Sequence, residues 1–257
     1  MDHYVPPFKL TPKILDLCTQ IAALTGRFEG LNLPTPKILL RKTNQVKTIH
    51  GTTAIEGNTL SVEQITAIFD GKRVTGSEKE IKEVKNAIDA YSKIKTFNIY
   101  SVKDLCLAHK ILMNGLIPDA GKFRSESVGI IKLDKVGHIA PSARLVPTHM
   151  ANLFSFLKKD KEIHPLVKAA AFHYELEFIH PFSDGNGRTG RLWEHAILVD
   201  WHPVFEMVSV EAVVKKNHQD YYAALEKSDK KGSSEDFIEF NLSTLLKALK
   251  ESFMEFK

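Results

Sequence analysis

The segment His180-Pro181-Phe182-Ser183-Asp184-Gly185-Asn186-Gly187-Arg188-Thr189-Gly190-Arg191 holds a dense set of reactive and charged groups. A histidine, a carboxylate, a glycine-flanked turn and two arginines follow one another within this short stretch. Chemistry on a triphosphate needs a base, cationic groups and oriented amides at close quarters. The alternative is an ordinary surface turn with a charged helix start, which does not require this combination. The segment therefore predicts a phosphate-binding site.

The second half of the segment is expected to open a helix near Asn186, because apolar residues at helical spacing follow it. These residues are Leu192, Trp193, Ala196, Ile197 and Val199. The first amides of a helix have no partner inside the helix and therefore bind anions. Gly185 and Gly187 allow left-handed or nest-like backbone angles and a close approach to phosphate, and Asn186 tolerates such angles and braces the turn.

The charged side chains of the segment suggest separate tasks. Arg188 and Arg191 are three residues apart, share one helix face and could neutralise phosphate oxygens. Asp184 suits Mg²⁺, which prefers one or two carboxylates together with substrate phosphates. His180 has a solution pKa near neutrality and is the natural general base for a hydroxyl, although a structural histidine before a proline is the alternative. Phe182 is expected to anchor the loop in the core.

The whole segment resembles the signature of the Fic (filamentation induced by cAMP) family, His-Pro-Phe-x-Asp-Gly-Asn-Gly-Arg-x-x-Arg, at every specified position. The resemblance implies an adenylyltransferase that moves AMP from ATP to a Ser, Thr or Tyr hydroxyl of a target protein and releases pyrophosphate. By the same resemblance His180 activates the hydroxyl, Asp184 holds Mg²⁺, Gly185 to Gly187 cradle phosphates, and Arg188 and Arg191 grip the β/γ end of ATP.

A second stretch, Thr52-Thr53-Ala54-Ile55-Glu56-Gly57, resembles the inhibitory motif of this family, Ser/Thr-x-x-x-Glu followed by Gly or Asn. Its position before the signature implies the class with an N-terminal inhibitory helix, in which Thr52, Glu56 and Gly57 are the motif residues. Glu56 would pair with Arg191 and occupy the cation that the γ-phosphate needs, and such a pair is costly to break from one side. By itself the short pattern also fits a solvated glutamate at a helix end.

Two further features are similar to the family. Residues 118–147 interleave glycines and prolines with β-branched residues and predict a short β-hairpin, which resembles the flap that holds the target by strand addition. The expected tip is Val136-Gly137-His138-Ile139, with Gly137, His138 and Ile139 as docking residues; a hairpin without a docking role is the alternative. Tyr221-Tyr222 resembles a tyrosine pair near adenine, with Tyr222 as the stacking residue and a core role as the alternative. Asp229 stands where relatives often have Asn, and we assign it no adenine contact.

Helical periodicity covers most of the remaining chain and predicts an all-α fold, a Fic-type helical bundle with a small β-hairpin flap. Helices are expected over 11–26, 36–57, 61–69, 77–94, 101–115, 150–157, 166–179, 186–201, 211–227 and 237–253, several of them opened by capping boxes. We divide the chain into an N-terminal helical region with the inhibitory motif, 1–75, and a catalytic core, 76–257, packed as one compact unit.

The composition is that of an ordinary soluble protein. The 257 residues carry a formal net charge of +4, and the lysines are interspersed with acids, as in Lys158-Lys159-Asp160-Lys161-Glu162, so no nucleic-acid partner is indicated. The two cysteines are expected to be reduced core residues. No apolar run of membrane-spanning length and no secretory signal is visible, which predicts a cytoplasmic protein without a membrane partner.

The sequence leaves other activities open. The expected partners are ATP and a protein target, with Mg²⁺ as cofactor, and the resemblance also allows self-modification and a homodimer. The same site could run the reverse reaction, in which Glu56 orients a water that removes AMP from a target. Phosphoryl transfer is disfavoured because the Doc branch carries Lys where Gly187 stands. A regulatory module that holds nucleotide without chemistry is a further alternative, against which the intact His180 argues.

Overall fold

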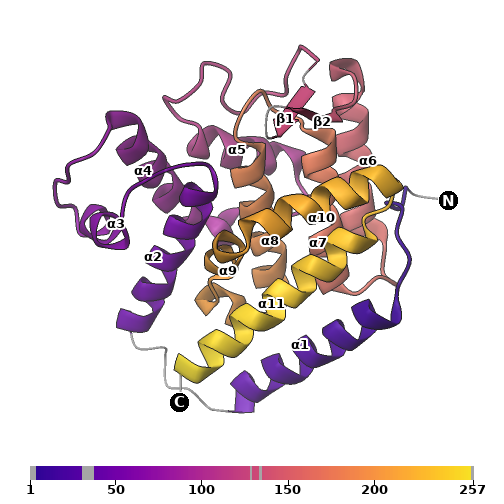
Figure 1. The fold of residues 1–257 in the computed structure, drawn as a ribbon, viewed down its shortest axis with the longest axis horizontal. Coiled ribbons are helices and arrows are strands. Elements are labelled where there is room, and N and C mark those ends of the chain that lie inside the picture. Colours follow the sequence, from indigo (N-terminus) through magenta and orange to yellow (C-terminus); the bar gives the residue numbers. More distant parts are fainter. Residues whose placement is uncertain (1–3, 31–37, 128, 133–134, 256–257) are drawn as a thin grey trace.

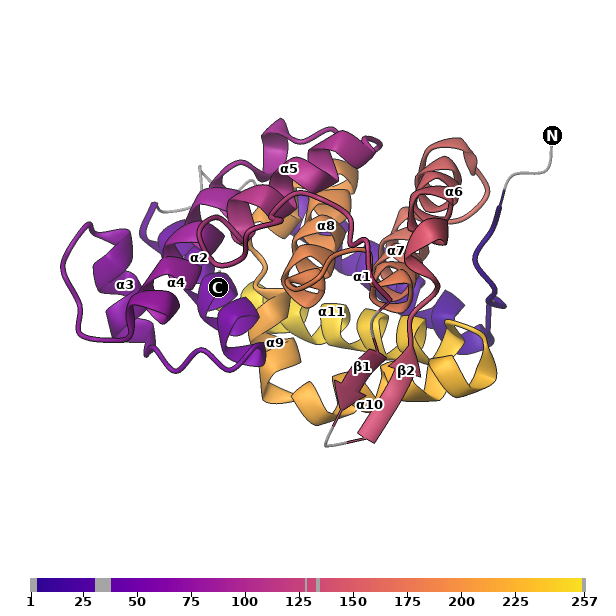
Figure 2. The same ribbon diagram turned by 90° about the horizontal axis from the view of Figure 1, so that it is seen from above.

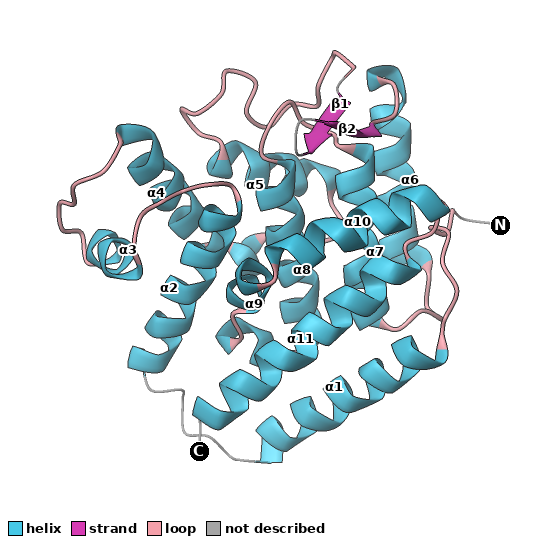
Figure 3. Ribbon diagram, in the orientation of Figure 1, coloured by secondary structure: helices cyan, strands magenta, loops and turns pink. Residues whose placement is uncertain are grey.

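The computed structural model describes residues 4–30, 38–127, 129–132 and 135–255. The described chain is built of helices and one two-stranded hairpin, and Figures 1 and 3 show the strands at one edge of the helical body. The elements are α1 (Pro12–Gly30), α2 (Ile38–Ile55), α3 (Val62–Phe69), α4 (Glu78–Ser92), η1 (Ile94–Thr96), α5 (Val102–Leu112), β1 (Gly129–Lys132), β2 (Lys135–Ile139), η2 (Ala143–Leu145), α6 (Val146–Lys159), α7 (Pro165–Ile179), α8 (Asn186–Trp201), η3 (Pro203–Met207), α9 (Val210–Lys216), α10 (His218–Lys231) and α11 (Glu235–Glu255). The prediction of an all-helical fold is confirmed.

Helices α7 and α8 form the centre of the molecule and pack against each other. Both are buried around most of their circumference, which is why α7 shows no single apolar face in the sequence. Helices α5, α6 and α11 contact this central pair, and α1 packs along α11. The loop that joins α7 to α8 is the signature segment, so its backbone is fixed at both ends by the core.

Helix α2 runs along α9 and lies in the left part of Figures 1 and 2. The close approach depends on Gly51, where an added Cβ would fall 2.5 Å from the carbonyl carbon of Glu211. Helices α3 and α4 cover α2 on its other side. The capping box predicted at Ser61 is present, with Gln64 as its partner.

One expected helix is wrong in its extent. The sequence predicts a single helix over 211–227, but α9 ends at Lys216 and α10 begins at His218. Asn217 between them has φ −122° and ψ 34°, outside helical values, and its side-chain amide donates to the carbonyl oxygen of Val213. Asparagine competes with the helix for its own backbone in this way, and the break allows α10 to turn toward α7.

The hairpin lies within the predicted range 118–147, but the residues expected at its tip lie in a strand. Strands β1 and β2 pair antiparallel, with Gly129 opposite Ile139 and a register shift between Ile130 and Ile131. The residues expected at the tip, 136–139, lie inside β2 instead, as their β-branched Val and Ile favour. Residues 133–134, between the strands, lie outside the described residues, as do the side chains of His138 and Ile139. The expected start of the second helix at Pro36 also lies outside them.

The described helices give no membrane span. None of them combines the length and the apolar character needed to cross a bilayer.

Candidate active site

Most of the predicted site residues meet at one cavity of about 750 Å³. It lies between the loop after α7, the first turn of α8, the end of α2 and one face of α10. The predicted residues that line it are His180, Asp184, Gly185, Asn186, Gly187, Arg191, Glu56 and Tyr222. Arg188, Thr52 and Gly57 are not part of its wall. The side chains of the flap residues 137–139 lie outside the described part of the chain.

His180 ends α7 in a left-handed conformation, with φ 49° and ψ 62°. Among the described residues other than glycine it alone has a positive φ, a conformation that costs about 1–3 kcal/mol and needs support from its surroundings. The support comes from Arg124, which is 4% exposed. Its Nε donates to the carbonyl oxygen of His180 at 2.7 Å, and its other nitrogens donate to the carbonyls of Glu126, Pro141 and Ile179.

His180 lines the cavity, and one of its ring nitrogens contacts the backbone of α7. Its Nδ1 lies 3.4 Å from the carbonyl oxygen of Glu177, one helical turn earlier. Nδ1–H is therefore the donor in that contact, and Nε2 is left with the lone pair that can accept a proton.

The loop itself is braced by Asn186 and His109. The side chain of Asn186, 2% exposed, accepts from the amide of Phe182 and donates to its carbonyl oxygen, both at 2.9 Å. His109 stacks on the ring of Phe182 with centroids 3.7 Å apart and donates from Nε2 to the carbonyl of Asp184 at 2.9 Å. Its Nδ1 accepts from the amide of Gly121, so the ring is neutral, and burial lowers the pKa of His109.

The two signature glycines act differently from one another. Gly185 has φ 80°, as predicted for a left-handed turn. Gly187 lies in the first turn of α8 without a positive φ, so the expectation of a left-handed angle there is wrong. Space explains this glycine: an added Cβ would lie 2.6 Å from Oε1 of Glu56 and 3.1 Å from Nη1 of Arg191.

The two arginines also differ. Arg188, 6% exposed, points to Glu83 of α4 at 3.4 Å and to Asp184 at 3.3 Å. The Asp184 side chain is 56% exposed, and its Oδ1 also accepts from the amide of Gly185. Arg188 thus ties the loop to α4 and orients Asp184, whereas the sequence predicts that both arginines face the phosphate site.

Arg191 is 3% exposed, and the hydrogen bonds that it donates among the described residues go to Thr52 of α2 and to Glu56, directly after this helix. Nη2 donates to Oε1 of Glu56 at 2.7 Å and to the carbonyl oxygen of Thr52 at 3.1 Å, and Nε donates to the Thr52 hydroxyl at 3.1 Å. Burial by itself would lower the pKa of Arg191, but the charges around it, the Glu56 carboxylate first among them, together raise the pKa. The pairing predicted between Glu56 and Arg191 is present in the structure.

The tyrosine pair forms the α10 side of the cavity. Tyr221 is 2% exposed, and its hydroxyl lies 3.1 Å from Nε2 of His173. Tyr222 is half-buried and meets Tyr221 edge to face, with centroids 5.2 Å apart. Burial raises the pKa of Tyr222, and the nearby Glu56 adds to this. Tyr221 is thus held in the core, and Tyr222 offers the more accessible ring of the two.

Sequence reasoning missed Arg124, His109 and Glu83. Arg124 and His109 are distant in sequence from the loop they brace and sit in no motif, and Glu83 is one of many acids on the expected helix 77–94. No cluster of three or more metal-binding side chains occurs in the described parts of the chain.

Comparisons with known proteins agree with this geometry. The Fic/DOC family model matches residues 99–198. A crystal structure of a Fic family protein from Desulfovibrio desulfuricans G20 has a TM-score of 0.92 and 42% sequence identity, covering 98% of this chain and 77% of that chain. The chain therefore belongs to the Fic/DOC family.

Curated relatives add names with an activity. A protein adenylyltransferase Fic of Nematostella vectensis is 31% identical over 208 residues, which are 75% of this chain and 45% of the relative. One of Culex quinquefasciatus, with the same name, is 28% identical over 76% of this chain and 39% of the relative. The chain spans less than half the length of these curated relatives.

Proposed function

We propose that this protein is a protein adenylyltransferase that is inhibited by its own helix α2. The observation that carries the proposal is the pairing of Glu56 with Arg191 in the cavity that also holds His180. A phosphate-binding loop with a base at one end and a cation at the other matches the needs of nucleotidyl transfer. ATP as the nucleotide, and a protein hydroxyl as the acceptor, are supported by the names of the relatives.

The reaction assigns one task to each group. Nε2 of His180 takes the proton of a Ser, Thr or Tyr hydroxyl as the oxygen attacks the α-phosphorus of ATP. The new P–O bond forms while the bond from the α-phosphorus to the bridging oxygen of the β-phosphate breaks, so pyrophosphate leaves with the electron pair. The amides at the start of α8 and the guanidinium of Arg191 face the negative oxygens. Tyr222 supplies a ring for stacking on adenine.

Mg²⁺ fits the donor set at this site. Asp184 is the exposed carboxylate beside the phosphate loop, and its Oδ1 is engaged by Gly185 and Arg188 while its side chain stays half open to the cavity. One carboxylate plus substrate phosphates is the usual protein contribution to Mg²⁺. The bound ion would neutralise charge on the phosphates.

The inhibition follows from charge and space. Glu56 neutralises Arg191 and places a carboxylate where the terminal phosphate of ATP would lie, so a triphosphate meets repulsion in place of attraction. Displacing Glu56 leaves Arg191 still held by both oxygens of Thr52. Thr52 would therefore keep the arginine in position in the active state.

The test is a transfer assay with ATP labelled at the α-phosphate. The Glu56→Gly variant should label itself or a protein in a cell lysate at least tenfold faster than the wild type, and mass spectrometry with each nucleoside triphosphate identifies the group and the acceptor. The double variant with His180→Ala should lose the signal. Glu63→Gly, which removes an exposed glutamate from α3, is the matched control and should behave as the wild type. Unchanged labelling in Glu56→Gly would refute the inhibitory role.

Removal of AMP from a modified target is a second candidate function. It is favoured by the position of the Glu56 carboxylate, which lines the same cavity as His180 and could orient a water. Modified protein made with the Glu56→Gly variant, repurified and mixed with wild type, should then release AMP. If wild type releases none while Glu56→Gly labels its targets, transfer alone is the function.

A further inference from the structure

A second cavity lies farther toward the start of α2, and His180 is not among the residues that line it. Its volume is about 130 Å³, and its walls come from α2, α3, α4, η1, α8 and η3. An apolar cavity of similar size, about 150 Å³, can hold a benzene ring. This cavity, called the α2–α4 pocket below, therefore has room for a small organic molecule.

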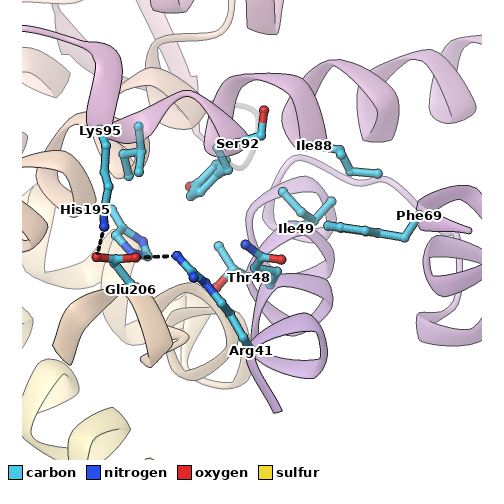
Figure 4. Close-up of a pocket in the computed structure, with 12 residues that line it drawn as sticks. Arg41, Thr48, Ile49, Phe69, Ile88, Ser92, Lys95, His195 and Glu206 are labelled. Carbon is cyan, nitrogen blue, oxygen red and sulfur yellow. Dashed lines mark hydrogen bonds and ion pairs between the residues drawn. The ribbon is translucent and has the colours of Figure 1, made fainter. Parts of the chain in front are cut away.

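The apolar residues of the pocket lie together on one side of it. Figure 4 shows Ile49 of α2, Phe69 of α3 and Ile88 of α4 grouped on one side of it. A purely inorganic anion would leave these side chains without contacts, whereas a carbon skeleton would bury them.

The opposite wall is rich in hydrogen-bond donors. Arg41 and Lys95 both reach Glu206, as Figure 4 shows, and their side chains are 47% and 59% exposed, so part of each cation faces solvent at the mouth. Thr48 is 4% exposed and lines the pocket, and its hydroxyl makes no hydrogen bond to any described residue. A hydroxyl that is open to the pocket, on the same helix as Arg41, and two partly exposed cations are donors that an external carboxylate could accept from.

The pocket is joined to the Arg191 site by α2 itself. Arg41, Gln45 and Thr48 in the pocket and Thr52 and Glu56 at Arg191 follow one another at spacings of three or four residues, so they form one face of the helix.

Tyr91 provides a second connection. It lines the pocket, donates to Oε1 of Glu211 at 2.9 Å and interacts with the side chain of Thr52. His195, also in the wall, contacts the same Glu211 oxygen through Nδ1 at 3.0 Å. A molecule that contacts α2 and Tyr91 in this pocket therefore touches the supports of the inhibitory pair.

We propose that the α2–α4 pocket is an effector site for a small carboxylate with an aromatic or branched aliphatic body, and that its occupant strengthens the inhibition by Glu56. The direction follows because the pocket is open in the structure in which Glu56 holds Arg191, and a ligand stabilises the conformation that it fits. The regulatory half rests on the proposed function, whereas the binding half does not.

Benzoate is the probe for binding, measured by calorimetry on the full chain, with benzamide as its neutral counterpart of the same shape. Benzoate should bind one to one, and benzamide at least roughly tenfold more weakly, because the charge-assisted hydrogen bonds are lost. Thr48→Val and Lys95→Ala should each weaken benzoate by roughly tenfold. Lys93→Ala removes a neighbouring exposed lysine that pairs with Asp89 and should change nothing.

Two results would overturn the binding half. One is equal affinity for benzoate and benzamide, or affinity unchanged by both Thr48→Val and Lys95→Ala. The other is tighter binding in Glu56→Gly, which would place the carboxylate on the freed Arg191 instead of in the pocket.

The coupling is tested by reciprocity. Saturating ATP with Mg²⁺ should weaken benzoate binding by roughly fivefold or more in the wild type and leave it unchanged in Glu56→Gly, because Glu56 is the link between the sites. The same weakening in both proteins would refute the coupling. Failure of ATP to bind either protein would count against the proposed function, while the benzoate series with Thr48→Val and Lys95→Ala would still decide the pocket.

Discussion

At the scale of single residues, the site depends on a strained histidine and on the buried arginine that supports it. His180 keeps a left-handed backbone because its carbonyl oxygen and three neighbouring carbonyls accept from Arg124. The role of His180 could be predicted from the signature, because the chemistry lies in adjacent residues. Arg124 could not, since a lone arginine in a loop carries no local pattern that distinguishes it from a solvated one.

Arg124→Met should expose this dependence. The variant keeps an unbranched apolar side chain but removes the charged donors to four carbonyls, so the free energy of unfolding in urea should fall by about 2–3 kcal/mol. In the Glu56→Gly background the labelling rate should fall as well, because His180 loses its orientation. Arg144→Met, at an exposed position of η2, should stay within about 0.5 kcal/mol of the parent. Equal stability of the two variants would contradict the bracing role.

At the scale of elements, the inhibitory motif is placed by the contact between α2 and α9. Nothing in the pattern of α2 marks Gly51 as important, since a glycine inside a helix ordinarily only weakens it. In the structure Gly51 permits backbone contact with Glu211, and this contact sets where Thr52 and Glu56 meet Arg191.

Gly51→Ala should therefore push α2 away from α9. The added Cβ would meet backbone atoms of Glu211 and Ala212 within 2.5–2.7 Å, and backbone cannot move aside cheaply. We expect a loss of about 1–3 kcal/mol in the free energy of unfolding and faster self-labelling than in the wild type. Gly26→Ala in α1, where an added Cβ meets nothing within 4 Å, is the control and should be neutral or slightly stabilising. Slow labelling in a destabilised Gly51→Ala protein would show that the inhibitory contact does not depend on this packing.

The contact between the N-terminal segment and α7 predicts a pH dependence of stability. Burial raises the pKa of Glu175 to about 7, and a hydrogen bond from the Tyr4 hydroxyl at 3.0 Å opposes this only in part. The folded state thus binds a proton that the unfolded state releases near its ordinary pKa of 4.5. Between pH 4.5 and 7 stability should fall as the pH rises, by an amount on the order of 3 kcal/mol.

Glu175→Gln isolates this carboxyl. We expect the free energy of unfolding of the variant, measured in urea from pH 4.5 to 8, not to show this fall with rising pH. Above pH 7 the variant should be more stable than the wild type. Glu235→Gln is the control, because it removes a carboxylate that accepts from the exposed amide of Lys9. If the free energy of unfolding changed with pH equally in Glu175→Gln and in the wild type, Glu175 would not be the group responsible.

At the scale of the whole molecule, local patterns and long-range contacts were not equally accessible to prediction. Helix existence, the capping box at Ser61 and the glycine turn at Gly185 follow from neighbours in the sequence, and all are present. The break between α9 and α10 depends on how each helix packs on the core. The spacing of apolar residues along the sequence does not contain this information. The contact of Glu56 with Arg191 joins residues 135 positions apart, and only the resemblance to a family predicted it.

This long-range contact predicts how nucleotide should affect stability. Without Glu56, Arg191 loses the carboxylate that it pairs with, so ATP with Mg²⁺ at 100 times its Kd should stabilise Glu56→Gly by about 2.7 kcal/mol. For a chain of this size that corresponds to a rise in Tm of roughly 5–10 °C. The same nucleotide concentration should shift the wild type much less, because part of the binding energy is used to displace Glu56. The double variant with His180→Ala should keep the shift, since binding does not need the base. Differential scanning fluorimetry decides the matter, and equal shifts in wild type and Glu56→Gly would mean that Glu56 and ATP do not compete for Arg191.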